Sequence, residues 1–215
     1  MLKLACKGTL NAVALAAAWP CALTVWLEGG LNPWREDAFV FWAQLLSLAP
    51  GMPGMYLRRA FYAWTLEFCS LDSCVGFGAI FSNRQAVVES RVYIGPFALI
   101  GSARLRRGCL IGSRASLLSG GRLHAQSASG DWLPTDPALR QQIEIGENAW
   151  LGEGAIVMAD IGPRAMVSAG AVVSTPVPER VMVAGNPARF VKRLAADDSA
   201  ADSGVWRPQP VAVEA

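Results

Sequence analysis

Residues 145–156 read Ile145-Gly146-Glu147-Asn148-Ala149-Trp150 and then Leu151-Gly152-Glu153-Gly154-Ala155-Ile156, so a six-residue phrase is repeated directly. Each copy starts with an aliphatic residue, continues with glycine and carries alanine at its fifth position. Less regular copies extend from about Val75 to Pro187. A short fixed period predicts a repeat architecture, because each unit can bury its apolar face only against neighbouring copies.

The repeat predicts short parallel strands wound into a triangular prism. β-branched and small residues suit the strands, and Gly and Asn suit the corners. Three phrases make one coil of about 18 residues, neighbouring coils are spaced by about 4.8 Å, and the region provides about five coils. The first positions are expected to point inward as ladders. The fifth positions must be small because they also lie inside the prism: Ala98, Ala149, Ala155, Ala165 and Ala171.

The N-terminal residues 1–70 are strongly apolar. Thr9–Leu27 carries no charge and is about long enough to span a bilayer, which takes about 20 residues. Five of the eight tryptophans fall in this region, and tryptophan favours the membrane–water boundary. We therefore predict a membrane-associated helical region, kinked or re-entrant at Pro20 if the proline interrupts it. The alternatives are a helix packed on protein and a cleaved secretory signal ending near Ala16–Ala18. We expect Arg58 and Arg59 to rest against anionic headgroups.

Three further boundaries follow from the spacing. Residues 71–194 form the predicted β-helix domain. Within it, Ala125–Gln142 lacks the six-residue spacing and is rich in Ser, Asp and Pro, so it predicts a loop that leaves the prism. Loops held by a rigid scaffold often carry function. After an expected short C-terminal helix, residues 195–215 are rich in Ala, Asp and Pro and predict a flexible tail.

Composition excludes several classes of function. The net charge of +2 does not indicate nucleic-acid binding. The five cysteines are odd in number and lack a regular framework, which indicates free thiols in a reducing compartment. Cys69 and Cys74 have no second Cys or His pair to complete a zinc site, and His124 is the only histidine. We therefore predict no metal.

The C-terminal part of the repeat resembles a known family, the hexapeptide-repeat acyltransferases. The shared motifs are Asn148–Gly152, Ala169–Val173 and Ala184–Arg189. Among these proteins the chain most resembles the exopolysaccharide, colanic-acid-type O-acetyltransferases. The resemblance implies a mainly β fold, a left-handed parallel β-helix. It also implies an enzyme that uses acetyl-CoA and works as a homotrimer with its active sites between subunits.

The resemblance also implies a set of site residues. Residues 119–124 precede Ile145 by about the distance that separates the family's catalytic histidine from its tryptophan-bearing coil, which makes His124 the general base. Imidazole suits this role because its pKa lies near neutral pH. Asp131, Asp136, Glu144 or a backbone carbonyl would orient it. The acetyl-CoA residues implied are Gly152 and Glu153 at the thioester, Ala169 and Ser174 along the pantetheine arm, and Arg189 and Lys192 at the phosphates.

The acceptor is less sharply indicated. Arg122 and Asn83 are candidate contacts, and so is Trp150, whose alternative role is packing against the sister subunit. Arg189 and Lys192 have an alternative too, as an ordinary solvated basic segment. Seven arginines between residues 84 and 122 suggest either a solvated outer face or a surface for anionic lipid: Arg84, Arg91, Arg104, Arg106, Arg107, Arg114 and Arg122.

Together these features predict an acetyl-CoA-dependent O-acetyltransferase. Its acceptor is expected to be a sugar or lipid-linked saccharide in surface polysaccharide biosynthesis. The expected location is the cytoplasmic side of the inner membrane, with the cytoplasm as the alternative. Two other functions stay open. One is an N-acyltransferase of a soluble amine, such as a sugar nucleotide or antibiotic, and the other is a non-catalytic β-helix membrane scaffold.

Overall fold

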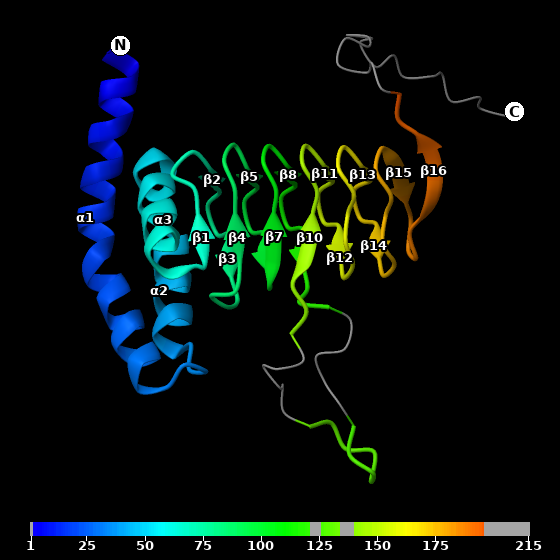
Figure 1. Cartoon of the computed structure of the whole chain (residues 1–215), viewed down its shortest axis with the longest axis horizontal. Helices are drawn as coiled ribbons and strands as arrows, with labels where there is room; N and C mark the ends of the chain where they lie inside the picture. Colours follow the sequence, from blue (N-terminus) through cyan, green and yellow to red (C-terminus); the bar gives the residue numbers. More distant parts are fainter. Residues whose placement is uncertain (1, 121–125, 134–139, 196–215) are drawn as a thin grey trace, which may run out of the picture.

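The computed structural model describes residues 2–120, 126–133 and 140–195, with side chains from residue 7 onward. Three helices precede a long prism of short strands, and the helices stand against one end of it (Figure 1). The helices are α1 (Leu2–Leu31), α2 (Asp37–Ser47) and α3 (Gly51–Thr65). The predicted helical N-terminal region is confirmed, and α1 continues through Pro20 as one helix.

The strands form three sheets, one for each face of the prism, and all pairs but the last are parallel. Sheet A contains β1 (Phe68–Cys69), β4 (Val87–Val88), β7 (Ala103–Leu105) and β10 (Ile143–Ile145). Sheet B contains β2 (Cys74–Val75), β5 (Tyr93–Ile94), β8 (Leu110–Ile111), β11 (Trp150–Leu151), β13 (Met166–Val167), β15 (Val181–Ala184) and β16 (Arg189–Arg193). Sheet C contains β3 (Ile80–Phe81), β6 (Leu99–Ile100), β9 (Ser116–Leu117), β12 (Ile156–Val157) and β14 (Val172–Val173).

The chain passes through the three sheets in turn and makes about six coils, one more than the sequence suggested. The additional coil begins at β1, before the first recognisable phrase. Its strands have few glycines at the second position, so the period is weak there.

The aliphatic first positions form the predicted inward ladders. On sheet B, Ile94, Ile111, Leu151 and Val167 lie in register on consecutive strands and are fully buried. Burying each such side chain stabilises the fold by about 1.5–3 kcal/mol. The alanines at the fifth positions are buried as well, which confirms that the narrow prism has room only for small residues there.

Glycine at the second position is explained by the next coil. A Cβ on Gly146 would lie 2.4 Å from the backbone nitrogen of Pro163, and a Cβ on Gly152 would lie 2.4 Å from that of Ala169. Both distances are far inside normal van der Waals contact. Stacking at the strand spacing therefore requires glycine at this position.

The helices cover the first coil, and two arginines make the connection. The Arg58 guanidinium is buried; its Nε donates to Val75 O (3.1 Å) and its Nη1 to Ala49 O (2.6 Å). Arg59 donates to Ser73 O (2.9 Å) and to the Asn11 side chain on α1. The expectation that this pair rests against lipid headgroups is therefore wrong, because both arginines are buried and their guanidinium groups bind protein groups instead.

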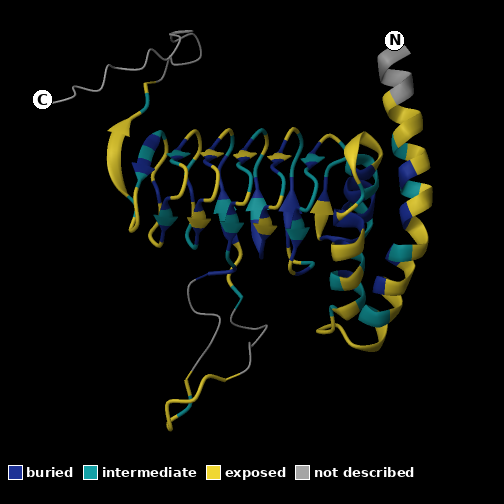
Figure 2. Cartoon of the chain, turned by 180° about the vertical axis from the view of Figure 1, so that it is seen from behind, coloured by how far each residue is buried: buried dark blue, intermediate teal, exposed yellow. Residues whose placement is uncertain are grey.

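Helix α1 is apolar on both faces. Its inner face packs on α3 through Ala14, Ala18, Ala22 and Val25, all of them buried. Its outer face exposes Val13, Leu23, Leu27 and Leu31, and appears as the exposed side of the outermost helix in Figure 2. The stretch Lys7–Leu31 is long and apolar enough to cross a membrane, with 22% of its most apolar window buried. It thus differs from a core helix, which is buried all round.

The C-terminal segment is a strand, so the expected short C-terminal helix is wrong. After a turn through Gly185 and Asn186, β16 pairs antiparallel with β15. The open edge of β15 offers unpaired backbone N–H and C=O groups, and the segment satisfies them by pairing as a strand. The tail that was expected at 195–215 lies, from residue 196 on, outside the described residues.

The insertion lies between β9 and β10 and leaves the prism at the corner between sheets C and A (Figure 1). Its roots are fixed by hydrogen bonds. The Gln141 backbone N–H donates to Ser119 O (3.0 Å), and the Ser119 hydroxyl accepts from the Ser102 N–H (2.7 Å). Within the loop, Gln126 and Trp132 form an antiparallel bridge.

Candidate functional site

A depression of about 570 Å³ on sheet B gathers four of the residues that the sequence indicated: Trp150, Gly152, Glu153 and Ala169. Trp150 stands on β11 and is 48% exposed, whereas Gly152 is buried at the end of the same strand. Ala169 lies on the next coil, where its backbone passes directly over Gly152. The six-residue period places these positions together, because equivalent residues of neighbouring coils stack.

The backbone in this depression offers unpaired donors. The N–H groups of Glu153 and Ala169 have no hydrogen-bond acceptor among the described residues, whereas Gly154 N–H donates to Ser113 O (2.9 Å). The Glu153 side chain is exposed. Free backbone N–H groups are suited to stabilise an oxygen that becomes negative during a reaction.

Other lining residues were not indicated by the sequence. Tyr93, Leu110 and Met166 lie in register with Trp150 and form an apolar wall. The buried Ser168 hydroxyl has no hydrogen-bond partner among the described residues. Tyr93, Leu110 and Met166 occupy the outward positions of the repeat, whose residue types vary most, so the six-residue period alone does not identify them.

The remaining acetyl-CoA candidates lie elsewhere on the subunit. Ser174 lines a second depression, of about 850 Å³, together with Gln141 and Gln142 at the root of the insertion. Arg189 lines a third depression, of about 350 Å³, beside β14 and β15, and Lys192 is exposed on β16. A single chain therefore does not bring all the candidates into one cavity.

His124 and Arg122 lie outside the described residues, as does Asp136. Of the candidates for orienting His124, Asp131 accepts from the Ser129 hydroxyl (2.8 Å). Glu144 accepts from Arg106 (2.9 Å). Asn83 is 2% exposed; its Oδ1 accepts from Gln85 N–H (3.0 Å) and its Nδ2 donates to Ser82 Oγ (3.3 Å). In this subunit Asn83 therefore holds a corner of the prism.

Three of the arginines are paired with carboxylates on the outer face of the prism. Arg106 contacts Glu89 (3.0 Å) and Glu144 (2.9 Å), and Arg107 pairs with Glu147. Arg104 lies 3.8 Å from Glu67. The Arg107 guanidinium lowers the pKa of Glu147, chiefly through their hydrogen bond. These pairs neutralise the surface locally and favour a solvated outer face over a surface for anionic lipid.

Comparison with known proteins identifies the fold. No protein-family model and no curated protein matches the sequence. A hexapeptide-repeat-containing acetyltransferase from Vibrio cholerae, solved with acetyl coenzyme A, matches at a TM-score of 0.55 and 17% identity. That match covers 73% of this chain and 85% of the other. The chain has the hexapeptide-repeat acetyltransferase fold. The left-handed parallel β-helix expected from the sequence is thereby confirmed.

Two further matches have lower TM-scores. A galactoside acetyltransferase in complex with coenzyme A matches at 0.47 with 16% identity, over 74% of this chain and 82% of that one. PerB from Caulobacter crescentus, solved with CoA and GDP-perosamine, matches at 0.34 with 24% identity. That match covers 57% of this chain and 53% of PerB, so the chain spans about half of PerB's length.

Among the described residues, no group of three or more His, Cys, Asp and Glu side chains is placed to hold a metal ion. Burial raises the pKa values of the Cys69 and Cys109 thiols to about 11 and about 12, which disfavours the thiolate form that binds metals.

Proposed function

We propose that this chain is an acetyl-CoA-dependent O-acetyltransferase that acts on a sugar or lipid-linked saccharide in surface polysaccharide biosynthesis. The observation that carries the proposal is the depression on sheet B. Trp150, Gly152, Glu153 and Ala169 meet there, and two backbone N–H groups lack an acceptor. Free N–H groups of this kind are suited to stabilise a thioester carbonyl whose oxygen becomes negative during attack.

In the proposed reaction, the imidazole of His124 takes the proton from a hydroxyl of the acceptor as its oxygen attacks the thioester carbon. The free N–H groups stabilise the negative carbonyl oxygen. The carbon–sulfur bond then breaks, the acetyl group stays on the acceptor oxygen, and the proton passes from His124 to the departing thiolate. Arg189 and Lys192 would hold the phosphates of the donor, because phosphate oxygens prefer charged donors.

We propose a homotrimer in which a neighbouring subunit completes the site. Exposed apolar side chains occupy two faces of the prism: Tyr93, Leu110 and Trp150 on sheet B, and Leu99 and Ile156 on sheet C. Apolar rows of this kind are typical of subunit contacts. Packing sheet B of one subunit near sheet C of the next would bring the separate acetyl-CoA candidates toward one groove.

We also propose attachment to the cytoplasmic face of the inner membrane through the outer face of α1. Helix α1 is held to the domain along its length, since Arg59 contacts Asn11 and Trp26 Nε1 donates to Trp64 O (3.0 Å). Because α1 is fixed to the domain in this way, an α1 that crossed the membrane would pull the charged prism into the bilayer. A helix lying in the interface with Leu23, Leu27 and Leu31 toward the lipid avoids that cost.

The deciding experiment compares the wild type with His124→Ala. We expect both proteins to bind coenzyme A equally in calorimetry, and His124→Ala to lose about 10²- to 10⁴-fold in thiol release from acetyl-CoA with sugar acceptors. Gln126→Ala, in the same loop, is the matched control and keeps its rate. Retained transfer by His124→Ala would refute the base assignment.

The same assay separates the alternatives. Transfer to amino sugars but not to hydroxyl acceptors would replace the O-acetyltransferase with an N-acetyltransferase. A wild type that does not bind coenzyme A would favour the non-catalytic scaffold.

A further inference from the structure

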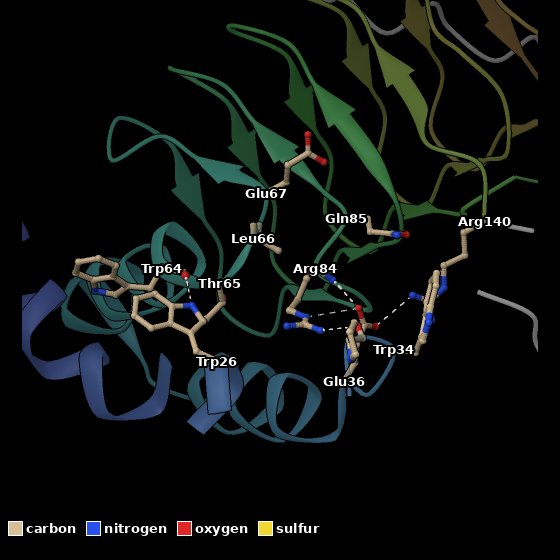
Figure 3. Close-up of a pocket in the computed structure, with 11 residues that line it drawn as sticks. Trp26, Trp34, Glu36, Trp64, Thr65, Leu66, Glu67, Arg84, Gln85 and Arg140 are labelled. Carbon is tan, nitrogen blue, oxygen red and sulfur yellow. Dashed lines mark hydrogen bonds and ion pairs between the residues drawn. The ribbon is translucent and has the colours of Figure 1, made fainter. Parts of the chain in front are cut away.

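A cavity of about 570 Å³ lies between the helices and the first coils of the prism, away from the depression on sheet B. It receives side chains from the end of α1, the α1–α2 connection, the end of α3, the corner before β4 and the root of the insertion (Figure 3). The lining residues are Trp26, Pro33, Trp34, Glu36, Trp64, Thr65, Leu66, Glu67, Arg84, Gln85 and Arg140. None of them belongs to the proposed acetyl-CoA site.

The polar side of the cavity is held rigidly by one carboxylate. Glu36 Oε2 accepts from Arg140 (3.3 Å), and Glu36 Oε1 accepts from the backbone N–H of Arg84 (3.1 Å). Arg84 also donates to Pro33 O (3.1 Å). Figure 3 shows Glu36 between the two guanidinium groups. The side chains of all three are at most 22% exposed.

Charge in the cavity is balanced. Two arginines and two glutamates line it, Arg84 and Arg140 against Glu36 and Glu67. Both guanidinium groups already have carboxylate or carbonyl partners. A phosphate would have to displace these partners, so the cavity favours an uncharged ligand that offers hydroxyl groups to planar donors and acceptors.

The apolar side of the cavity consists of indole rings with fixed orientations. Trp64 Nε1 donates to Leu15 O (3.1 Å), and Trp26 Nε1 donates to Trp64 O (3.0 Å). These two rings and Trp19 pack edge to face, with centroids 5.2–5.9 Å apart. Trp34 is 63% exposed at the other end. Ring faces carry negative charge density and attract the C–H groups on one face of a saturated, hydroxylated ring.

We propose that this cavity binds an uncharged sugar residue of the acceptor. The indole rings contact the C–H face of the sugar, and Glu36, Gln85 and Arg140 exchange hydrogen bonds with its hydroxyls. The inference rests on the proposed function, since it names the acceptor subsite of that enzyme. It commits to a neutral sugar ring, not to a phosphate or a lipid chain.

The insertion connects this cavity with the acetyl-CoA side of the prism. Arg140 lines the cavity, whereas Gln141 and Gln142, the next two residues, line the depression that contains Ser174. Gln142 Nε2 also donates to the backbone carbonyl of Gln85 in the cavity wall (3.2 Å). The loop that carries His124 therefore ends between the two cavities. A sugar bound in the cavity would lie beside Arg140, at the C-terminal root of that loop.

The test is saturation-transfer NMR on the full-length protein with methyl glycosides of glucose, galactose and mannose, in the absence of acetyl-CoA. We expect at least one glycoside to give a signal that Trp34→Ala and Glu36→Gln each lower at least 10-fold. Phe41→Ala, another exposed aromatic residue on the adjacent helix but outside the cavity, should leave the signal unchanged. Inorganic pyrophosphate should not compete.

Three results would overturn the proposal: no glycoside signal from the wild type, a signal that Trp34→Ala and Glu36→Gln leave intact, or displacement of the glycoside by pyrophosphate. Glycoside binding is measured without the donor, and coenzyme A binding is measured separately by calorimetry. Loss of the sugar subsite is therefore distinguishable from failure of the proposed transfer. A wild type that binds glycoside but not coenzyme A would support the sugar-binding cavity and refute the proposed acetyltransferase activity.

Discussion

At the scale of single residues, the repeat is enforced by what cannot fit. Gly146 and Gly152 are required because the backbone of the next coil occupies the space that a Cβ would need. The fifth-position alanines are buried because the narrow interior of the prism has no room for larger side chains. At the corners the constraint is conformational: Asn148 and Arg164 adopt positive φ angles of 54°, which most residues avoid.

We expect Gly146→Ala to lower the free energy of unfolding by about 1–3 kcal/mol, because the new methyl group forces two coils apart. Gly30→Ala is the matched control, since no atom lies within 4 Å of the position its Cβ would take. It should change stability by less than about 1 kcal/mol, in the stabilising direction. Chemical unfolding followed by circular dichroism measures both. Equal stability of Gly146→Ala and wild type would contradict the stacking argument.

These same residues explain what the sequence could predict. First-position aliphatics, second-position glycines and fifth-position alanines are set by contacts that every coil repeats, so the prism and its inward ladders were predictable. Arg58 was not, because its role depends on carbonyls of α2 and of the first coil, which lie far from it in sequence. The same holds for the cavity of Trp26, Trp34 and Glu36, which is assembled from five separate segments.

At the scale of elements, α1 combines two surfaces with different partners. Its small inner residues allow close packing on α3, and the hydrogen bond of Trp64 Nε1 to Leu15 O fixes the helix in place. Its outer leucines have no protein contact of comparable extent in this subunit. The sequence predicted that α1 is apolar but not that it has two different apolar faces. Small and large apolar residues are both compatible with a membrane helix, so composition does not separate the face that packs on protein from the face that is exposed.

Replacing the outer leucines tests the membrane proposal. We expect Leu23→Gln, Leu27→Gln and Leu31→Gln together to weaken binding to phosphatidylcholine vesicles about 100-fold, since three exposed leucines that enter the lipid contribute about 3 kcal/mol. The control combines Leu133→Gln, Phe190→Gln and Val191→Gln, which are exposed away from α1. Co-sedimentation measures the bound fraction. Wild-type binding that requires anionic lipid and disappears in high salt would contradict an apolar contact.

At the scale of the whole molecule, the acetyl-CoA candidates are divided between faces of one prism. Trp150 and Ala169 belong to the depression on sheet B, while Ser174 and Arg189 line others. The resemblance implied active sites between subunits, but it did not indicate on which face of one subunit each candidate residue would lie. Sequence alone does not show that division, because neighbouring subunits leave no spacing in the chain.

The trimer proposal makes a separate prediction. We expect the wild type to sediment as a trimer and Trp150→Glu to dissociate, since a charge placed in an apolar subunit contact is costly to desolvate. Phe68→Glu, an exposed aromatic position on sheet A, should leave the trimer intact. Sedimentation velocity at several protein concentrations measures the distribution. A wild type that stays monomeric at every protein concentration would contradict an active site shared between subunits.

The covered ends of the prism have a consequence for assembly. Stacked parallel strands tend to recruit more strands, so a bare prism would polymerise head to tail into fibres. At one end Arg58 and Arg59 occupy the Val75 and Ser73 carbonyls that an incoming chain would need. At the other end β16 runs antiparallel on β15, so a parallel coil from another molecule cannot continue sheet B in register. Continuation of sheet B along the axis is therefore opposed at both of its ends, which favours association through the sides of the prism.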